Sequence, residues 1–360
     1  MNSIRPAALP EARPKLATTI PIENIYYLLA YAWDLFQEAE ECPVDVNNCP
    51  DVHNLLAAVL VNGIHSLMRR GIDKGYCATV EVTPRLRGRI DVISSYRRLT
   101  QLSGTMQCQF DELTADTFPN KIIKSTCRLL SVPSSPLTNR NRVQIRLLLD
   151  QLHGISEIRL SARSFARVQL HRNNRHYRLL LSVCRLIVEC FLPDENESGR
   201  RFRSLWDDDR LMNRIFEKFV RNFARRHCED ASVGVSHIKW FGEWDEEFDS
   251  LLPLMKTDVT LERTGRTTIL DCKYYKEALV KSFDKSRLHP GHLYQLNAYL
   301  QNSSCHEPNR TFDGILLYPS IDSTGLHATF NLLGKQVRVE SINLDQPWQC
   351  IESELKSILD

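Results

Sequence analysis

Residues 251–276 read LLPLMKTDVTLERTGRTTILDCKYYK, and this stretch decides the fold of the second half of the chain. It contains two β-rich runs separated by a short polar break with a glycine, which is typical of a β-hairpin. If Thr264 and Gly265 form the turn, the register continues outward until Asp258 lies opposite Asp271. The sequence therefore predicts two carboxylates side by side at the open end of a hairpin.

Side chains alternate along a strand, so Asp258, Asp271 and Lys273 are expected on one face of this hairpin. The other face is predicted to be apolar, with Val259, Leu261, Leu270 and Cys272. Directly opposed residues have Cβ atoms roughly 5 Å apart, and two like charges at that distance repel. A divalent cation between them, with an ammonium group beside it, would activate water against a phosphodiester. The alternative is an ordinary exposed acidic hairpin, because Asp-X-Lys also occurs by chance.

The bulk composition predicts a globular chain of two domains. The 360 residues are 42% hydrophobic and 25% charged, and this length exceeds what one core usually supports. The formal net charge of +2 hides an asymmetry, since residues 81–190 contain 18 Lys and Arg against 8 Asp and Glu. A basic middle favours either a polyanion or an acidic protein partner.

Cysteine usage favours a reducing compartment. The 11 cysteines are odd in number and show neither a Cys-X-X-Cys pair nor a zinc-like spacing. The first residues lack the apolar core of a signal peptide, and no run approaches the ~20 apolar residues that span a bilayer. We therefore expect a cytoplasmic protein with no membrane contact.

The domain division follows from helix and loop signals along the chain. Residues 1–19 are predicted to be a flexible lead and residues 193–204 the interdomain link. Residues 20–195 should form a mixed α/β N-terminal domain, and residues 200–360 a second domain. In the second domain the expected order is helix, hairpin with Asp…Asp-X-Lys, helix, buried strand and a further hairpin. This order is typical of restriction-endonuclease-like folds, the PD-(D/E)xK class, so the overall fold class is α+β.

Segment by segment, the chain resembles the McrC family. Members of this family are the nuclease subunits of McrBC restriction systems, which act on DNA that contains 5-methylcytosine. The similar segments run in order through nearly the whole length: IPIENIYYLLAYAW, PRLRGRID, FDELTADTFPNKIIKST, LLPLMKTDVTL, LDCKYYK, GHLYQLNAYL, GILLYP and QPWQCIESEL.

The resemblance implies a Mg²⁺-dependent DNA endonuclease. On the family pattern Asp258 and Asp271 bind the metal, together with the backbone carbonyl of Cys272. Lys273 orients or deprotonates the attacking water and steadies charge on the phosphate. The proline that often precedes the first acidic residue in this nuclease class is replaced by Thr257. Gln295 lies on the following helix, where related nucleases often have a polar active-site residue.

A weaker candidate for the site is Glu217, on the helix that opens the second domain. The sequence favours a solvated helix acid over a metal or supporting carboxylate at this position.

Arg85, Arg87 and Arg89 form a basic loop in the N-terminal half. The loop could bind phosphates, since arginine suits that contact, or it could be a solvated turn. The resemblance implies a third role, which is contact with the partner of McrC-like proteins, the hexameric AAA+ GTPase McrB, and stimulation of its GTP hydrolysis.

The sequence therefore predicts the cleaving subunit of a modification-dependent restriction complex, acting on double-stranded DNA whose modified cytosine is read by the partner. The chain contains no G-x-x-x-x-G-K-[ST] phosphate loop and cannot drive translocation itself. The alternative is a non-catalytic assembly and GTPase-activating subunit with a vestigial nuclease. A stand-alone repair nuclease is disfavoured by the long N-terminal half.

Overall fold

The computed structural model describes residues 20–35, 49–170, 174, 176–191, 208–274, 279–282, 285–321 and 325–360. The chain divides into two compact units. The first unit joins Met1–Phe36 to Ser204–Asp360, and the second consists of Gln37–Arg203. The predicted lead at residues 1–19 and the predicted link at residues 193–204 lie outside the described residues. Within the described part, no helix is long and apolar enough to cross a membrane.

The predicted hairpin is present with the predicted register. Strand β7 (Val259–Arg263) and strand β8 (Arg266–Cys272) pair antiparallel, with Val259 opposite Leu270 and Arg263 opposite Arg266. The turn holds Gly265 at a φ of 72°, a left-handed conformation that glycine adopts without strain. The register follows from the turn, because a two-residue connection leaves each strand only one way to pair.

The hairpin lies inside a six-stranded mixed sheet in the order β12-β13-β11-β8-β7-β4. Strand β11 (Thr311–Ser320) pairs parallel with both β8 and β13 (Lys335–Asn343). The edges are formed by β12 (His327–Leu332) and β4 (Ser232–Gly234). The predicted buried strand and the predicted last hairpin correspond to β11 and to β12 with β13. A short pair, β9 (Leu279–Ser282) with β10 (Lys285–Leu288), follows the hairpin.

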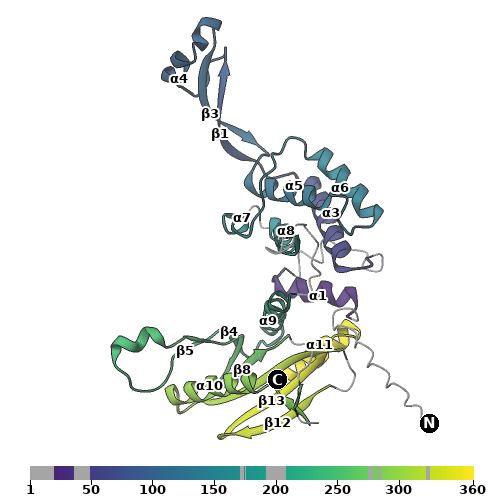
Figure 1. The fold of residues 1–360 in the computed structure, drawn as a ribbon, viewed down its shortest axis with the longest axis vertical. Helices are drawn as coiled ribbons and strands as arrows, with labels where there is room; N and C mark the ends of the chain where they lie inside the picture. Colours follow the sequence, from purple (N-terminus) through teal and green to yellow (C-terminus); the bar gives the residue numbers. More distant parts are fainter. Residues whose placement is uncertain are drawn as a thin grey trace, which may run out of the picture. The chain divides into compact units, whose positions relative to one another are not determined.

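Helix α10 (Pro290–His306) covers one face of the sheet (Figure 1). Its Leu296 and Leu300 are fully buried in a cluster with Ile269 and residues of β11 and β13. A Cβ at Gly314 would come within 2.9 Å of both leucines, so glycine permits this close approach of helix and strand. The neighbouring positions on β7 and β8 point to the opposite face and are equally buried, so the sheet is a core layer on both sides.

Helix α1 (Ile22–Ala32) packs in this first unit, against α9 (Asp209–His227) and α11 (Trp348–Leu359). The rings of Tyr31 and Trp348 stack with centroids 5.6 Å apart, and Phe219 lies edge-on to both. The predicted division assigned this helix to the N-terminal domain. The structure differs because the apolar face of α1 finds its partners on α9 and α11, which follow much later in the sequence.

The second unit has four main helices: α3 (Val52–Arg70), α5 (Phe118–Leu130), α6 (Asn139–Gln151) and α8 (Tyr177–Phe191). The sequence predicts a helix that Asp51 caps and Gly71 ends, and α3 lies between these two residues. The Asp51 carboxylate accepts from the N–H of Asn54, and Gly71 has a positive φ. The short helix α7 (Ala162–Ala166) packs against α8.

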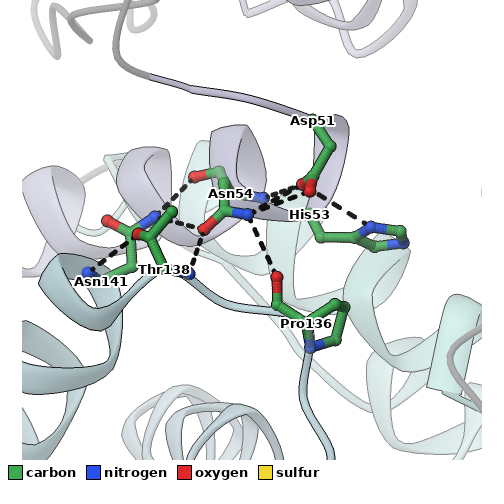
Figure 2. A network of polar contacts seen from close by, with 6 residues as sticks. All are labelled: Asp51, His53, Asn54, Pro136, Thr138 and Asn141. Carbon is green, nitrogen blue, oxygen red and sulfur yellow. Dashed lines mark hydrogen bonds and ion pairs between the residues drawn. The ribbon is translucent and has the colours of Figure 1, made fainter. Parts of the chain in front are cut away.

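Asn54 joins the beginnings of α3 and α6 through a polar network (Figure 2). Its side-chain amide donates to the Pro136 carbonyl (3.2 Å), and its side-chain oxygen accepts from the N–H of Thr138 (2.8 Å) and from Asn141 (3.0 Å). Because Asn54 is almost fully buried, each of these bonds offsets the desolvation of its amide. The network therefore holds the first turn of α3 against the first turn of α6.

A long antiparallel hairpin of β1 (Gly75–Thr83) and β3 (Met106–Thr114) extends away from the helices of this unit (Figure 1). The alternating residues 77–91 predict strands around a basic loop, and β1 and β2 (Arg89–Ile90) lie on its two sides. Strand β2 pairs with the other side of β3 and not with β1. The far end carries α4 (Val92–Arg97) and the 3-10 helix η3 (Thr100–Ser103). This end exposes a group of large apolar side chains: Leu86, Val92, Ile93, Tyr96, Leu99 and Leu102.

The first unit also has a protruding loop, residues 239–254, between the paired strands β5 (His237–Ile238) and β6 (Met255–Lys256) (Figure 1). It contains the 3-10 helix η6 (Glu246–Leu251). The base of the loop is fastened to α10, because the N–H of Phe241 donates to the Asn302 side chain at 2.7 Å. Strand β6 ends two residues before Asp258, so this base positions the start of the central hairpin.

The aromatic cluster between α1, α9 and α11 predicts a large stability effect. Phe219 is fully buried, and we expect Phe219→Ala to lower the free energy of unfolding of the first unit by about 3–5 kcal/mol. All five tryptophans belong to this unit, so urea denaturation followed by tryptophan fluorescence reports on it alone. The control is Phe248→Ala in the exposed loop, which should change the free energy by about 0.5 kcal/mol or less. Equal losses in both variants would contradict the assignment of α1 to this core.

Candidate active site

The open end of the β7–β8 hairpin brings Asp258 and Asp271 together. Asp258 immediately precedes β7, and Asp271 is the last residue but one of β8. Asp271 is fully buried and Asp258 half-buried. The backbone N–H of Cys272 donates to Oδ2 of Asp258 at 2.8 Å, which ties the first carboxylate to the strand that bears the second. The juxtaposition predicted from the sequence is therefore present.

Lys273 lies beside these carboxylates and is held by a chain of polar contacts. Its Nζ is 3.0 Å from Oδ2 of Asp271 and donates to Oε1 of Gln295 at 3.1 Å. The Gln295 amide in turn donates to the hydroxyl of Tyr299 (2.6 Å), and that hydroxyl donates to the backbone carbonyl of Lys256 (3.0 Å). The structure thus places Gln295 at the site and adds Tyr299, one helical turn later, as its support.

Burial dominates the electrostatics of the site. Burial raises the pKa of Asp271 to about 7, and the nearby charge of Asp258 adds to the rise. The ammonium of Lys273 lowers this pKa, but by less. Burial also raises the pKa of Asp258, in part offset by the N–H of Cys272. For Lys273, burial alone would lower the pKa, but the carboxylates of Asp271 and Asp258 outweigh it and raise the pKa. The ammonium therefore stays charged and is the main cationic group that the chain itself supplies.

Helix α9 contributes a third carboxylate, Glu217. Burial raises its pKa to about 7, and the charge of Asp258 adds to this, so the side chain lies at the site and not in bulk solvent. The sequence favoured a solvated helix acid here, which the structure contradicts. Asn213, one turn earlier, donates to the Glu217 carboxylate and accepts from the N–H of Tyr274 at 2.8 Å.

Sequence reasoning missed Asn213, Tyr299 and Arg221 as parts of this site. Arg221 on α9 donates to the backbone carbonyl of Asp258 at 2.9 Å and so fixes the start of β7. One signal was available, because Asn213, Glu217 and Arg221 recur at intervals of four along one flank of the apolar stripe of α9. Such a flank lies at the edge of the core, where polar side chains can reach a neighbouring strand.

The donor set fits a hard divalent cation such as Mg²⁺. Neither oxygen of the fully buried Asp271 receives a hydrogen bond of good geometry, although the Lys273 ammonium is close to one of them. An unsatisfied buried carboxylate is costly and can accept a metal in place of donors. Among the described residues no three His, Cys, Asp or Glu side chains gather within metal-binding reach. Proteins usually bind Mg²⁺ through one or two carboxylates, and water molecules complete its coordination.

The Cys272 side chain takes no part in this donor set. Its thiol is fully buried, and burial raises its pKa well above the usual range. Only the backbone carbonyl of Cys272 is therefore suited to the role expected from the sequence.

The three loop arginines belong to the other unit and not to this site. They are all exposed: Arg85 and Arg87 lie between β1 and β2, and Arg89 is the first residue of β2. Arg87 bonds to Glu81 and its guanidinium lies 3.9 Å from the ring centroid of Phe110. These contacts stiffen the loop, whereas Arg85 and Arg89 present their side chains to solvent.

The buried carboxylate of Asp271 predicts an unusual stability effect in metal-free protein. Asp271→Asn should not lower the urea midpoint of the first unit, because burial and the charge of Asp258 disfavour the carboxylate more than the Lys273 ammonium favours it. The matched control is Asp313→Asn, at a buried aspartate that accepts from Arg266 at 2.7 Å, and this variant should lower the midpoint. A clear loss of stability in Asp271→Asn, measured by tryptophan fluorescence in EDTA, would contradict this description of the site.

Comparisons with known proteins bear on the family. Residues 11–319 match the family described as "McrBC 5-methylcytosine restriction system component". The "Type IV methyl-directed restriction enzyme EcoKMcrBC" of Escherichia coli K12 is 32% identical over 342 residues, which cover 95% of this chain and 97% of that protein.

A solved structure supports the fold. It is a half-complex from a tetradecameric assembly of Thermococcus gammatolerans McrB AAA+ hexamers with bound McrC, and its matching chain superposes with a TM-score of 0.55 at 20% identity. The match covers 94% of this chain and 75% of that one. The chain therefore belongs to the family of McrBC 5-methylcytosine restriction system components, which confirms the resemblance to McrC seen in its sequence.

Proposed function

We propose that this chain is the DNA-cleaving subunit of a modification-dependent restriction complex, with Mg²⁺-dependent phosphodiester hydrolysis at Asp258, Asp271 and Lys273. The hairpin, the flanking helices α9 and α10 and the parallel strand β11 are the arrangement expected of a PD-(D/E)xK nuclease. The substrate is double-stranded DNA that contains modified cytosine, and the compartment is the cytoplasm.

One observation carries the proposal, which is the carboxylate of Asp271 beside Asp258 and Lys273 on the buried strand β8, with neither of its oxygens accepting a hydrogen bond of good geometry. A buried carboxylate that lacks hydrogen-bond donors destabilises a protein unless it binds something. The alternative, an assembly subunit with a vestigial nuclease, would permit an apolar or neutral residue at this position. The retained set of charges supports an active site.

When bound, Mg²⁺ would supply a Lewis acid that polarises the phosphate and lowers the pKa of a water. Asp258 and Asp271 would hold it, and Glu217, whose pKa the charge of Asp258 raises, would accept a proton at the site. Lys273 stabilises the negative charge that develops on the phosphate, because its ammonium is desolvated and held in place by Gln295. Tyr299 and Arg221 keep Gln295 and Asp258 in position.

The proposed partner is a hexameric AAA+ GTPase like McrB, which would supply translocation and recognition of the modified base. The T. gammatolerans assembly contains such hexamers with bound McrC. The far end of the β1–β3 hairpin supports a protein contact, since it exposes several large apolar side chains, which a nucleic-acid backbone would not bury. Arg85, Arg87 and Arg89 lie on the same hairpin and are proposed to contact the GTPase and stimulate its hydrolysis.

The nuclease assignment predicts a separation of functions. Lys273→Ala should reduce DNA cleavage by on the order of 10²–10³-fold, because it removes the charge next to the phosphate. Asp271→Asn should abolish cleavage by removing a metal ligand. Stimulation of the partner's GTP hydrolysis should persist in both variants, as measured by GTP turnover and cleavage of methylated DNA with the partner present. Wild-type cleavage by Asp271→Asn would rule out the assigned site.

The loop arginines predict the converse result. Replacement of Arg85, Arg87 and Arg89 by Ala should abolish stimulation of GTP hydrolysis and reduce cleavage only as a consequence of failed translocation. The charge-matched control replaces Arg140, Arg146 and Arg159, three exposed arginines on the helical part of the same unit. If the control loses as much stimulation as the loop variant, the loop is not the contact.

A further inference from the structure

Helix α9 presents a row of basic residues on the side turned away from its core. Arg210, Arg214 and Lys218 follow one another at intervals of four and are all exposed. Each interval is about 6 Å along the helix axis. Arg210 and Arg214 make no hydrogen bond or ion pair with any residue in the described part of the chain. Their guanidinium groups are therefore available to a ligand outside the chain.

Arg210 and Arg214 differ from the exposed basic residues that pair along their own helix. Arg185 pairs in this way with Glu189, and Lys356 with Glu352, each one turn away. Three acids precede Arg210 in the sequence: Asp207, which lies outside the described residues, Asp208, which caps the helix, and Asp209. The acid one turn after Arg214 is Glu217. Glu217 is directed to the active site and bonds to Asn213. Arg210 and Arg214 are thus exposed and form no ion pair within the described part of the chain.

The row shares helix α9 with Asn213 and Glu217, two residues of the candidate active site. Arg214 lies between Asn213, which bonds to the N–H of Tyr274, and Glu217, whose carboxyl is influenced by Asp258. Strand β6 adds an exposed basic residue, Lys256. Its charge lowers the pKa of both Asp258 and Glu217. Basic groups therefore border the carboxylates on α9 and on β6.

We propose that Arg210 and Arg214 on α9, together with Lys256 on β6, bind the phosphate backbone of the DNA and lay the strand across the carboxylates of the active site. This inference rests on the proposed nuclease function and names where its substrate lies. Arginine suits phosphate because its planar fork donates two parallel hydrogen bonds. The contacts carry no base information, which is consistent with recognition of the modified base by a partner.

The test is a salt titration of DNA binding with the full chain. Fluorescence anisotropy of a labelled duplex of about 30 base pairs, in EDTA and at several KCl concentrations, gives the slope of log affinity against log salt. Each phosphate contact contributes about 0.9 to the slope. Arg210→Ala with Arg214→Ala should therefore reduce the slope by about 2, and adding Lys256→Ala should reduce it by about 1 more. Because EDTA prevents hydrolysis, the result is independent of whether the chain cleaves DNA.

The charge-matched control is Arg140→Ala with Arg146→Ala on helix α6, where both arginines are exposed. An unchanged slope in this control with a reduced slope in the α9 variant supports the proposal. Equal reductions would overturn it, since net charge alone would then account for binding. A wild-type chain without salt-dependent binding at low salt would also overturn it. The unchanged urea midpoint of each variant serves as the control for folding.

Discussion

Two carboxylates brought side by side at the end of a buried hairpin are the constraint on which the rest of the first unit depends. At roughly 5 Å and an effective dielectric constant near 20, two ionised carboxylates repel by on the order of 3 kcal/mol. The turn at Gly265 fixes the register and so makes this repulsion unavoidable. The N–H of Cys272 and the ammonium of Lys273 offset part of this repulsion. Neither oxygen of Asp271, however, accepts a hydrogen bond of good geometry.

Helix α9 joins the hydrophobic core to the site. Its apolar face packs Phe219 and Phe223 against α1, while its flank carries Asn213, Glu217 and Arg221 to the strands. The same helix therefore sets the distance between the core and the carboxylates. A shift of α9 would loosen the start of β7 and the end of β8 together, because Arg221 bonds beside Asp258 and Asn213 bonds just after Lys273.

The sequence predicted the local features of the site and not those that depend on tertiary packing. The register of β7 and β8 followed from one turn, and Asp51 and Gly71 marked the ends of α3, because such signals act within a few residues. The placement of Glu217 could not be read in this way, since its burial depends on how α9 packs against β8. Strand β2 pairs with β3 and not with β1, and helix α1 packs against α9. In both cases the order of the segments along the chain does not determine which of them make contact.

The position of α1 has a consequence for biosynthesis. The second unit is inserted between α1, which ends at Ala32, and its packing partner α9, which begins at Asp209, 177 positions later. At a ribosomal rate of about 5–20 residues per second, α1 emerges roughly 10–35 s before α9. During this interval the apolar face of Ile25, Leu28 and Leu29 has no native partner, while the inserted unit is synthesised and folds. The first unit therefore cannot complete its core until α11 has been synthesised, which happens after the whole of the inserted unit.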